Sequence, residues 1–240
     1  MKMKKIIAML AGVLCLAGCL KDSPDMVAIN EIVTVKGGIF INDAGVRYGV
    51  ADTKIFSNFQ SDQRLFITGQ IEPASGDAKY DYKLYIEEYV AVSVQDCLKL
   101  STVEDESTLG IDPANLYSCW IDGGFINAVI TFSYDKYKDF DGVINLVFDD
   151  VRSTPEDIYL IVKNNQKGKS WLDEELIAAN LVYGAGIFSF PLNTVLDPDY
   201  KGQVRLHFDW TWFQTDPEDK TIPLRTTESR SETITINVDS

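Results

Sequence analysis

The sequence predicts an all-β protein: a small β-barrel, of the OB-like type by the resemblance described below, followed by an antiparallel β-sandwich, with room for one short helix. Beyond residue 33, apolar and polar residues alternate with the two-residue period of half-buried strands. Turn residues divide these runs at short intervals, and an acidic, sparsely apolar stretch at 102–112 separates the earlier runs from the later ones. We therefore predict a barrel domain at 33–100 and a sandwich domain at 110–240.

The first 19 residues have the features of a lipoprotein signal. Three lysines, Lys2, Lys4 and Lys5, precede the apolar run 6–17, and residues 16–19 read Leu-Ala-Gly-Cys. The run is too short for the roughly 20 residues that span a bilayer, so it is typical of a cleaved export signal. We predict a signal peptide at 1–18, a lipidated Cys19 and a tether at 19–32. The alternative is an ordinary signal in which Cys19 has no role.

The barrel prediction rests on several short strands and one long one. Gly37-Gly38 and residues 43–45 are turn signals around the run 39–41. Alternating runs follow at 46–50 and 65–71, and Gly69 inside the second predicts a bulge or a close backbone approach. The alternation from 80 to 94 is long enough that the strand must bend, which favours a small closed barrel over an open sheet.

The later strands alternate more regularly. They lie at 126–134, 144–148, 158–162, 188–192, 204–212 and 234–238. Such spacing, broken by turns, is typical of an antiparallel sandwich. Within it, Ser170 can cap a helix over 171–180.

Charge excludes one class of partner. The chain carries a formal charge of −14, and loss of the three signal lysines leaves −17 on the processed form. A surface this acidic repels phosphates, so we expect no nucleic-acid partner. Attachment to the membrane is then expected through the lipid on Cys19 alone.

No pattern of catalytic or metal-binding residues stands out. His207 is the single histidine and alternates onto a polar strand face with Arg205 and Asp209, so nucleophilic catalysis lacks its usual base. Zinc-ligand spacing is missing. Asp135, Asp139, Asp141 and Gly142 cluster as in a calcium loop, but their register does not match an EF-hand. An irregular calcium site remains open there, at Asp149-Asp150 or at 216–219, although charged turns between strands are commoner. We expect no metal and no cofactor.

The aromatic residues and cysteines have competing interpretations. Trp210 and Trp212 share an apolar face and are predicted to be core, whereas Phe213, Trp120 and Trp171 are candidates for a ligand surface. Cys97 and Cys119 are the two cysteines outside the first 19 residues. Export permits a disulfide between them, but we predict two packed thiols.

Two segments carry a resemblance to a known family. Residues 107–113, STLGIDP, and 119–128, CWIDGGFINA, resemble the central signature of the NigD-like lipoproteins of Gram-negative gut and oral bacteria. The likeness extends to the signal, to 80–82 and to 144–146. Cys119 and Asp122 depart from the pattern, which has an apolar residue and glycine there. The resemblance implies an OB-type domain joined to a β-sandwich. It carries over no catalytic residue, and an immunity-type role is implied only by association with a bacteriocin operon.

The leading functional hypothesis is a non-enzymatic, lipid-anchored envelope protein that binds a protein, peptide or glycan. We expect it at the outer membrane, on a face that the Lys21-Asp22 pair does not settle. The alternatives are a structural or assembly component, an immunity-type protein and, least favoured, a carboxylate-dependent glycoside hydrolase. The last is defined by the separation of two acids in space and so leaves no pattern in sequence.

Overall fold

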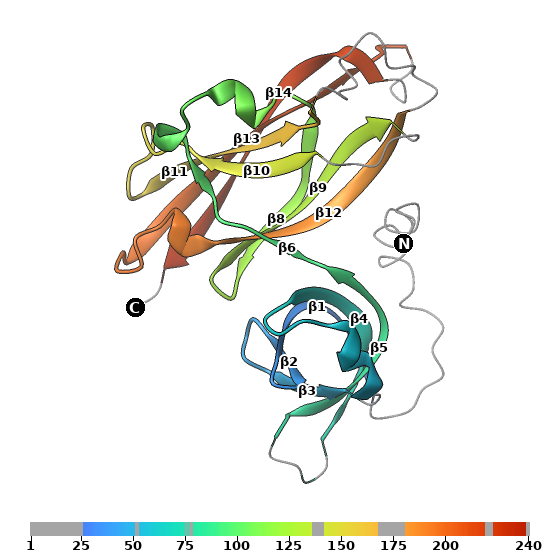
Figure 1. The fold of residues 1–240 in the computed structure, drawn as a ribbon. Helices are drawn as coiled ribbons and strands as arrows, with labels where there is room; N and C mark the ends of the chain where they lie inside the picture. Colours follow the sequence, from blue (N-terminus) through green and yellow to red (C-terminus); the bar gives the residue numbers. More distant parts are fainter. Residues whose placement is uncertain are drawn as a thin grey trace.

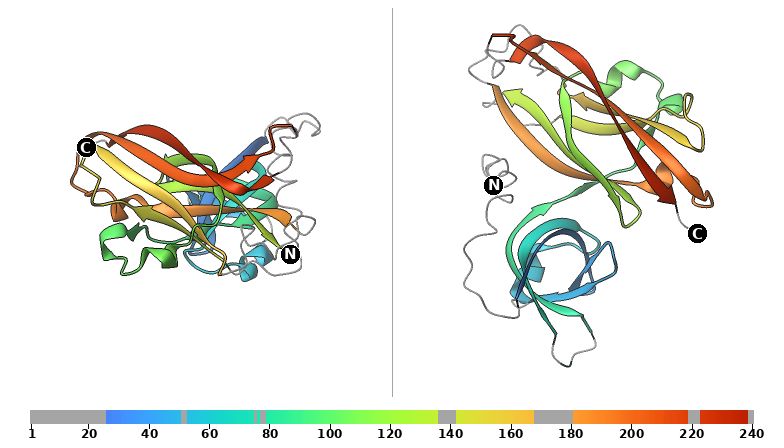
Figure 2. Two further views of the ribbon diagram at one scale, coloured as in Figure 1. Left: turned by 90° about the horizontal axis from the view of Figure 1, so that it is seen from above. Right: turned by 180° about the vertical axis from the view of Figure 1, so that it is seen from behind.

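The computed structural model describes residues 26–50, 53–74, 76, 79–135, 142–167, 181–218 and 223–238. The strands form a closed five-stranded barrel and two further sheets of five and four strands (Figure 1). The barrel lies at one end of the other two sheets (Figure 2). The prediction of an all-β chain with a barrel ahead of a sandwich is confirmed.

The barrel has OB-type Greek-key topology, with the order β1-β2-β3-β5-β4 closed by pairing of β4 with β1. β3 and β5 pair in parallel and the other neighbours are antiparallel. A 3₁₀ turn, η1 (Thr53–Asn58), follows β3. The strands are β1 (Val27–Lys36), β2 (Ile39–Asn42), β3 (Arg47–Val50), β4 (Arg64–Pro73) and β5 (Tyr82–Ala91).

Alternation along these strands fills the barrel. Val33, Phe40, Leu65, Ile67 and Leu84 are fully buried inside it. The bulge expected at Gly69 is confirmed. The β4–β5 register shifts between Thr68 and Gly69, and a Cβ on Gly69 would lie 2.3 Å from the Tyr85 carbonyl oxygen.

The predicted tether is too long. β1 begins at Val27, and its first residues pair with β4 as Val27 with Ile71 and Ala28 with Gln70. This start of β1 is largely exposed, so it has no alternating apolar pattern. Backbone pairing to β4 forms the strand there, and pairing leaves no mark on the sequence.

The remaining strands build the sandwich. One sheet has the order β14-β13-β11-β10-β7 and the other β6-β12-β9-β8. Short 3₁₀ turns, η2 (Leu100–Thr102), η3 (Glu106–Leu109) and η5 (Leu192–Thr194), join some of them. The strands are β6 (Ser93–Val94), β7 (Leu98–Lys99), β8 (Ala114–Asp122), β9 (Phe125–Asp135), β10 (Val143–Phe148), β11 (Asp157–Asn165), β12 (Leu181–Pro191), β13 (Gly202–Thr215) and β14 (Pro223–Val238).

Two details of the sandwich differ from the expectation. β7 pairs with β10, β6 with β12 and β11 with β13 in parallel, so the sheets are mixed rather than wholly antiparallel. Residues 93–99, expected in the barrel domain, pair instead within the sandwich sheets. The chain changes sheets at Val92, which is buried, so the apolar alternation continues across the change without marking it.

The core of the sandwich includes the predicted packed residues. Trp210 is buried in it, and Trp212 is partly buried against it. Cys97 and Cys119 are unpaired thiols within the same cluster, as predicted. Burial raises their pKa values, to about 11 for Cys97 and about 12 for Cys119, which makes both poor nucleophiles. The helix expected at 171–180 lies outside the described residues.

An apolar cluster and a buried ion pair join the barrel to the sandwich. Ile32 and Val92 pack with Val129 and Ile187, and Trp120 covers them. Beside this cluster, the Arg64 guanidinium binds both oxygens of Asp43 at 2.8 Å.

The sandwich completes the surroundings of this pair. The guanidinium of Arg64 lies 3.9 Å from the ring centroid of Phe125 and 3.4 Å from Asn127 Oδ1. Ser189 donates a 2.6 Å hydrogen bond to the same Asn127 oxygen. The signature segment 119–128 therefore forms the β8–β9 hairpin that docks on the barrel.

Candidate functional site

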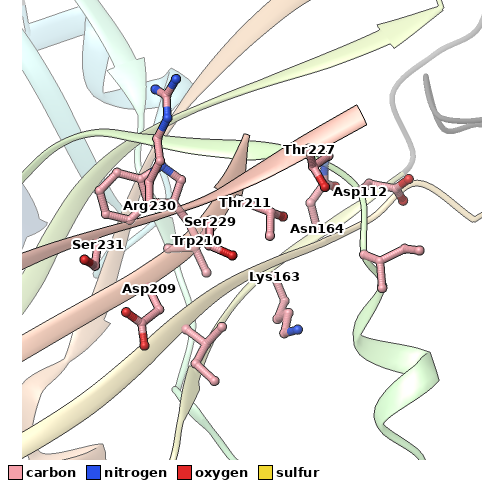
Figure 3. Close-up of a pocket in the computed structure, with 14 residues that line it drawn as sticks. Asp112, Lys163, Asn164, Asp209, Trp210, Thr211, Thr227, Ser229, Arg230 and Ser231 are labelled. Carbon is pink, nitrogen blue, oxygen red and sulfur yellow. The ribbon is translucent and has the colours of Figure 1, made fainter. Parts of the chain in front are cut away.

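A pocket of about 530 Å³ lies where β11 and β13 separate (Figure 3). The two strands pair in parallel only from Asp157–Arg205 to Ile161–Asp209. β11 continues to Asn165 on its pairing with β10, and β13 continues to Thr215 on its pairing with β14. Their facing edges thus diverge, and the pocket occupies the wedge between them.

The pocket is lined by both polar and apolar groups, and apolar atoms form the larger share of its surface. Cross-strand pairing sets Thr211 beside Ser229 and Asp209 beside Ser231 on one face of β13 and β14. Ile111, 75% exposed, lies at the side formed by the loop before β8. The other lining residues are Gly110, Asp112, Ile161, Val162, Lys163, Asn164, Trp210, Thr227 and Arg230.

The loop 110–112 is fitted closely to the edge of β11. A Cβ on Gly110 would lie 2.3 Å from the Asn164 carbonyl oxygen, and Gly110 has φ of +80°, so glycine is required there. The Asp112 N–H donates to that same oxygen at 3.0 Å, and the Asp112 carboxylate accepts the Gln166 N–H at 2.7 Å. The first signature segment, 107–113, therefore forms one wall of the pocket.

Two polar groups at the pocket lack a partner among the residues that the structure describes. Asn164 is fully buried, and its Nδ2 donates to the Pro113 carbonyl, but its Oδ1 accepts no hydrogen bond from the described residues. Lys163 is half-buried and forms no ion pair within the same ranges. Lys163 is a group that a ligand can bind, whereas Asn164 Oδ1 has no exposed surface and is not open to the pocket.

The two acids in the pocket are already bound by the protein. Asp112 accepts the Gln166 N–H, and Asp209 forms a 2.8 Å ion pair with Arg152. The two carboxylates lie at opposite ends of the pocket (Figure 3). A glycosidase requires one acid to protonate the leaving group while the other faces the same sugar, so this arrangement does not supply that pair.

His207 lies next to the pocket on the outer face of β13. Its Nε2 contacts Asp157 Oδ1 at 2.7 Å, its Nδ1 contacts Thr233 Oγ1 at 3.0 Å, and its ring stacks on Tyr159 at 4.5 Å. Arg205 binds both oxygens of Asp157. Hydrogen bonds from Arg205, and then from His207, lower the pKa of Asp157 to about 2.

This arrangement confirms the polar strand face predicted for Arg205, His207 and Asp209. The contacts of Asp157, His207 and Thr233 resemble an acid–base–hydroxyl relay, but Arg205 already holds the carboxylate. The array lies on a sheet face and outside the pocket lining. We assign it a structural role, since it joins β11, β13 and β14.

The aromatic candidates for a ligand surface have different positions. Phe213 is only 1% exposed, so this candidate is not available to a ligand surface. It lies where the register of β13 against β14 shifts, and it packs edge-on against Trp212. Trp120 packs at the junction with the barrel. Trp171 lies outside the described residues.

Cys19, Asp139 and Asp141 also lie outside the described residues, and Asp135 ends β9. Within the described ranges, no three His, Cys, Asp or Glu side chains gather closely enough to hold a metal ion. In the same ranges, no helix has the length and apolarity that a membrane crossing requires.

Sequence reasoning did not identify the pocket. The alternating hydroxyl residues on β14, which include Ser229, Ser231 and Thr233, were a visible sign of a polar outer face. The separation of β11 from β13 has no such sign, because periodicity shows which way a side chain points and not where two strands stop pairing.

The architecture is that of a two-part β protein in which an OB-type barrel is joined to a β-sandwich. Three solved structures share it: a protein of unknown function from Bacteroides vulgatus, a NigD-like immunity protein from Bacteroides caccae and a candidate lipoprotein from Bacteroides fragilis. The TM-scores are 0.60, 0.56 and 0.54, and the identities are 15%, 15% and 12%, respectively.

These likenesses extend over nearly the whole of each chain. They cover 88%, 87% and 90% of this protein and 92%, 94% and 99% of the three structures, in the same order. No family model matches the sequence, and no curated protein matches it significantly. At such identities the comparisons establish the fold, so the resemblance to NigD-like lipoproteins holds at the level of the architecture.

Proposed function

We propose that the protein is a non-enzymatic binding protein of the cell envelope, anchored by a lipid on Cys19, whose ligand occupies the pocket between β11 and β13. The observation that carries this proposal is the character of the pocket. It combines hydroxyl groups with Lys163, which forms no ion pair in the described part of the chain, while its two acids are bound by the protein. These groups favour recognition of a ligand over hydrolysis.

The proposed anchor would hold the barrel close to the membrane. Seven residues lie between Cys19 and Val27, where β1 begins, so the chain takes eight residue steps from one to the other. An extended chain spans at most roughly 3.3–3.6 Å per residue, so the tether would reach about 26–29 Å. We place the protein at the outer membrane, in line with the lipoprotein signal, and metabolic labelling with a lipid precursor would test the anchor. Label is expected on the wild type and not on Cys19→Ser.

The binding proposal is tested by measuring binding and turnover together. The full-length protein, purified in detergent, is incubated with a panel of soluble oligosaccharides and a panel of synthetic peptides. Retained ligands are eluted and identified by mass spectrometry. We expect a ligand that is retained and recovered intact, with retention reduced in Lys163→Met. Release of cleaved products, lost on changing Asp112 or Asp209, would contradict the proposal in favour of a hydrolase.

One observation favours the assembly role as a second candidate. β14 is a 16-residue strand at the edge of its sheet, and a long edge strand can pair with another chain. An immunity-type role, suggested by the name of the Bacteroides caccae structure, would also be a binding role. Light scattering of the purified protein would separate assembly from monomeric binding, because assembly through β14 predicts a stable oligomer.

A further inference from the structure

We infer that the ligand of this pocket is an extended peptide that adds a strand to the open edge of β13 and sets an acidic side chain beside Lys163. This inference rests on the proposed function and specifies its ligand class. It depends on three features: the backbone groups at the wedge, the way loop 110–112 already uses one strand edge, and the charge of Lys163.

Thr211 of β13 has backbone groups without a partner strand among the described segments. The Arg205 N–H donates to the Glu156 carbonyl, so the N–H and C=O groups of odd-numbered β13 residues point toward β11. Pairing with β11 ends at Asp209. The next such residue, Thr211, therefore turns its N–H and C=O into the wedge with no partner strand among the described segments.

The opposite edge already accepts an extended segment. The Asp112 N–H donates to the Asn164 carbonyl, which is the edge of β11 beyond its pairing with β13. Loop 110–112 of the protein itself thus lies along the edge of β11 inside the wedge. The edge left without a partner strand among the described segments is that of β13 at Thr211.

These groups favour a peptide over a glycan. A β-strand presents N–H and C=O groups along both of its edges, so it can pair with the N–H and the C=O of Thr211 together. On β13 the pocket extends from Asp209 to Thr211, so the peptide strand would pair there at Thr211. The volume of about 530 Å³ also lies within the usual range of roughly 300–1,000 Å³ for ligand pockets.

Lys163 adds selectivity for charge. Arg230, the other cation of the lining, pairs with Glu228 at 2.7 Å, whereas Lys163 forms no ion pair in the described part of the chain. A half-buried ammonium binds a carboxylate more strongly than a neutral group, because the hydrogen bond is charge-assisted. An acidic side chain on the peptide would fill this role, whereas a neutral glycan would not.

The test uses two libraries of acetylated and amidated random hexapeptides, one with a fixed central glutamate and a matched one with glutamine. Each is applied to the full-length protein in detergent, and retained peptides are identified by mass spectrometry. The best binder is then resynthesised with N-methyl groups on one or the other alternating set of its amides. Affinities are measured for the wild type and for Lys163→Met, which keeps most of the apolar stem.

We expect preferential retention from the glutamate library. Lys163→Met should weaken glutamate peptides on the order of tenfold or more and leave glutamine peptides unchanged. One set of N-methyl groups should abolish binding while the other spares it, because a strand pairs along one edge through alternate amides. N-methylation edits only the ligand, so this result does not depend on the folding of a variant.

Several outcomes would overturn the inference. Binding that responds equally to both N-methyl series would rule out strand addition, and equal retention from the two libraries would rule out the role of Lys163. If oligosaccharides bind and lose affinity in Ser229→Val while hexapeptides do not bind, the ligand class is wrong and the proposed function stands. If neither panel binds, both proposals fail.

Discussion

Two arginine–aspartate pairs in the barrel have similar geometry but different surroundings. Arg64 and Asp43 are 4% and 7% exposed, whereas Arg47 and Asp81 are 43% and 41% exposed. Water solvates the second pair in the folded state and hardly reaches the first. Removal of Arg64 therefore leaves a buried charge on Asp43, whereas removal of Arg47 leaves a hydrated charge on Asp81.

We predict that Arg64→Met lowers the free energy of unfolding by about 3–5 kcal/mol, because Asp43 is left buried and unpaired. The matched control, Arg47→Met, is expected to cost about 0–1 kcal/mol. Urea unfolding of the two variants measures both values. The further change of Asp43→Leu in Arg64→Met should recover part of the loss. Equal losses in the two single variants would contradict the account of the junction.

Asp157 is predicted to contribute to acid sensitivity. Arg205 and His207 lower its pKa to about 2 from an ordinary 3.8, so the unfolded state takes up the proton at higher pH than the folded state. The stabilisation is complete above about pH 4 and is lost as the pH falls toward about 2.

In Asp157→Asn this loss is absent, so its free energy of unfolding should fall less steeply between about pH 4 and pH 2 than that of the wild type. Urea unfolding at stepped pH measures the slopes. Glu104→Gln removes an exposed carboxylate and controls for net charge. If the slope of Asp157→Asn matches that of the wild type, the ion pair has no role in acid stability.

At the scale of elements, the β8–β9 hairpin explains why the signature segment contains two glycines. Gly123 and Gly124 both have positive φ, 55° and 79°, so a side chain at either position strains the turn. A Cβ on Gly123 would also lie 2.4 Å from Asp43 of the barrel, whereas one on Gly124 would meet open space. Gly123 is thus required by the turn and by the docking of the two parts.

We therefore predict that Gly124→Ala costs about 1–2 kcal/mol, from backbone strain alone. Gly123→Ala should cost about 1–3 kcal/mol more, because Asp43 has to shift and its contact with Arg64 is disturbed. Thermal or urea unfolding of the two variants makes the comparison directly. Equal costs would show that Asp43 adapts freely to a methyl group.

The elements differ in how far the sequence predicts them. The clean alternation in β9 and in β13 up to Trp212 predicts both strands and their buried faces, because one face of each packs in the core. The exposed start of β1 has no such pattern and was assigned to the tether. The change from barrel to sandwich at Val92 was also missed. Val92 is buried at the junction, as it would be if the barrel strand simply continued, so the apolar alternation does not mark the change.

The candidate site depends on relations that a single sequence does not contain. Trp210 reads correctly as core and also lines the pocket. The pocket exists because β11 leaves β13 after Ile161 and because Gly110 lets a distant loop approach Asn164. Both are contacts between segments far apart in the chain, so propensity and periodicity do not predict them.

At the scale of the molecule, the junction couples the two parts. Apolar side chains of both parts pack between them, and the Arg64–Asp43 pair is buried against the sandwich. If Cys19 carries the proposed anchor, the short stretch before β1 would hold the barrel near the membrane. The sandwich and its pocket follow the barrel in the chain, so the ligand would bind to the part that does not carry the anchor.

The most direct test of this account is hydrogen–deuterium exchange of the full-length protein with and without saturating ligand from the peptide and oligosaccharide panels. We predict slower exchange at 162–165 in β11 and at 210–215 in β13, with no change in β2 and β3 of the barrel. Protection confined to the barrel strands, or no protection in either part with the ligand bound, would contradict the assignment of the site to the wedge between β11 and β13.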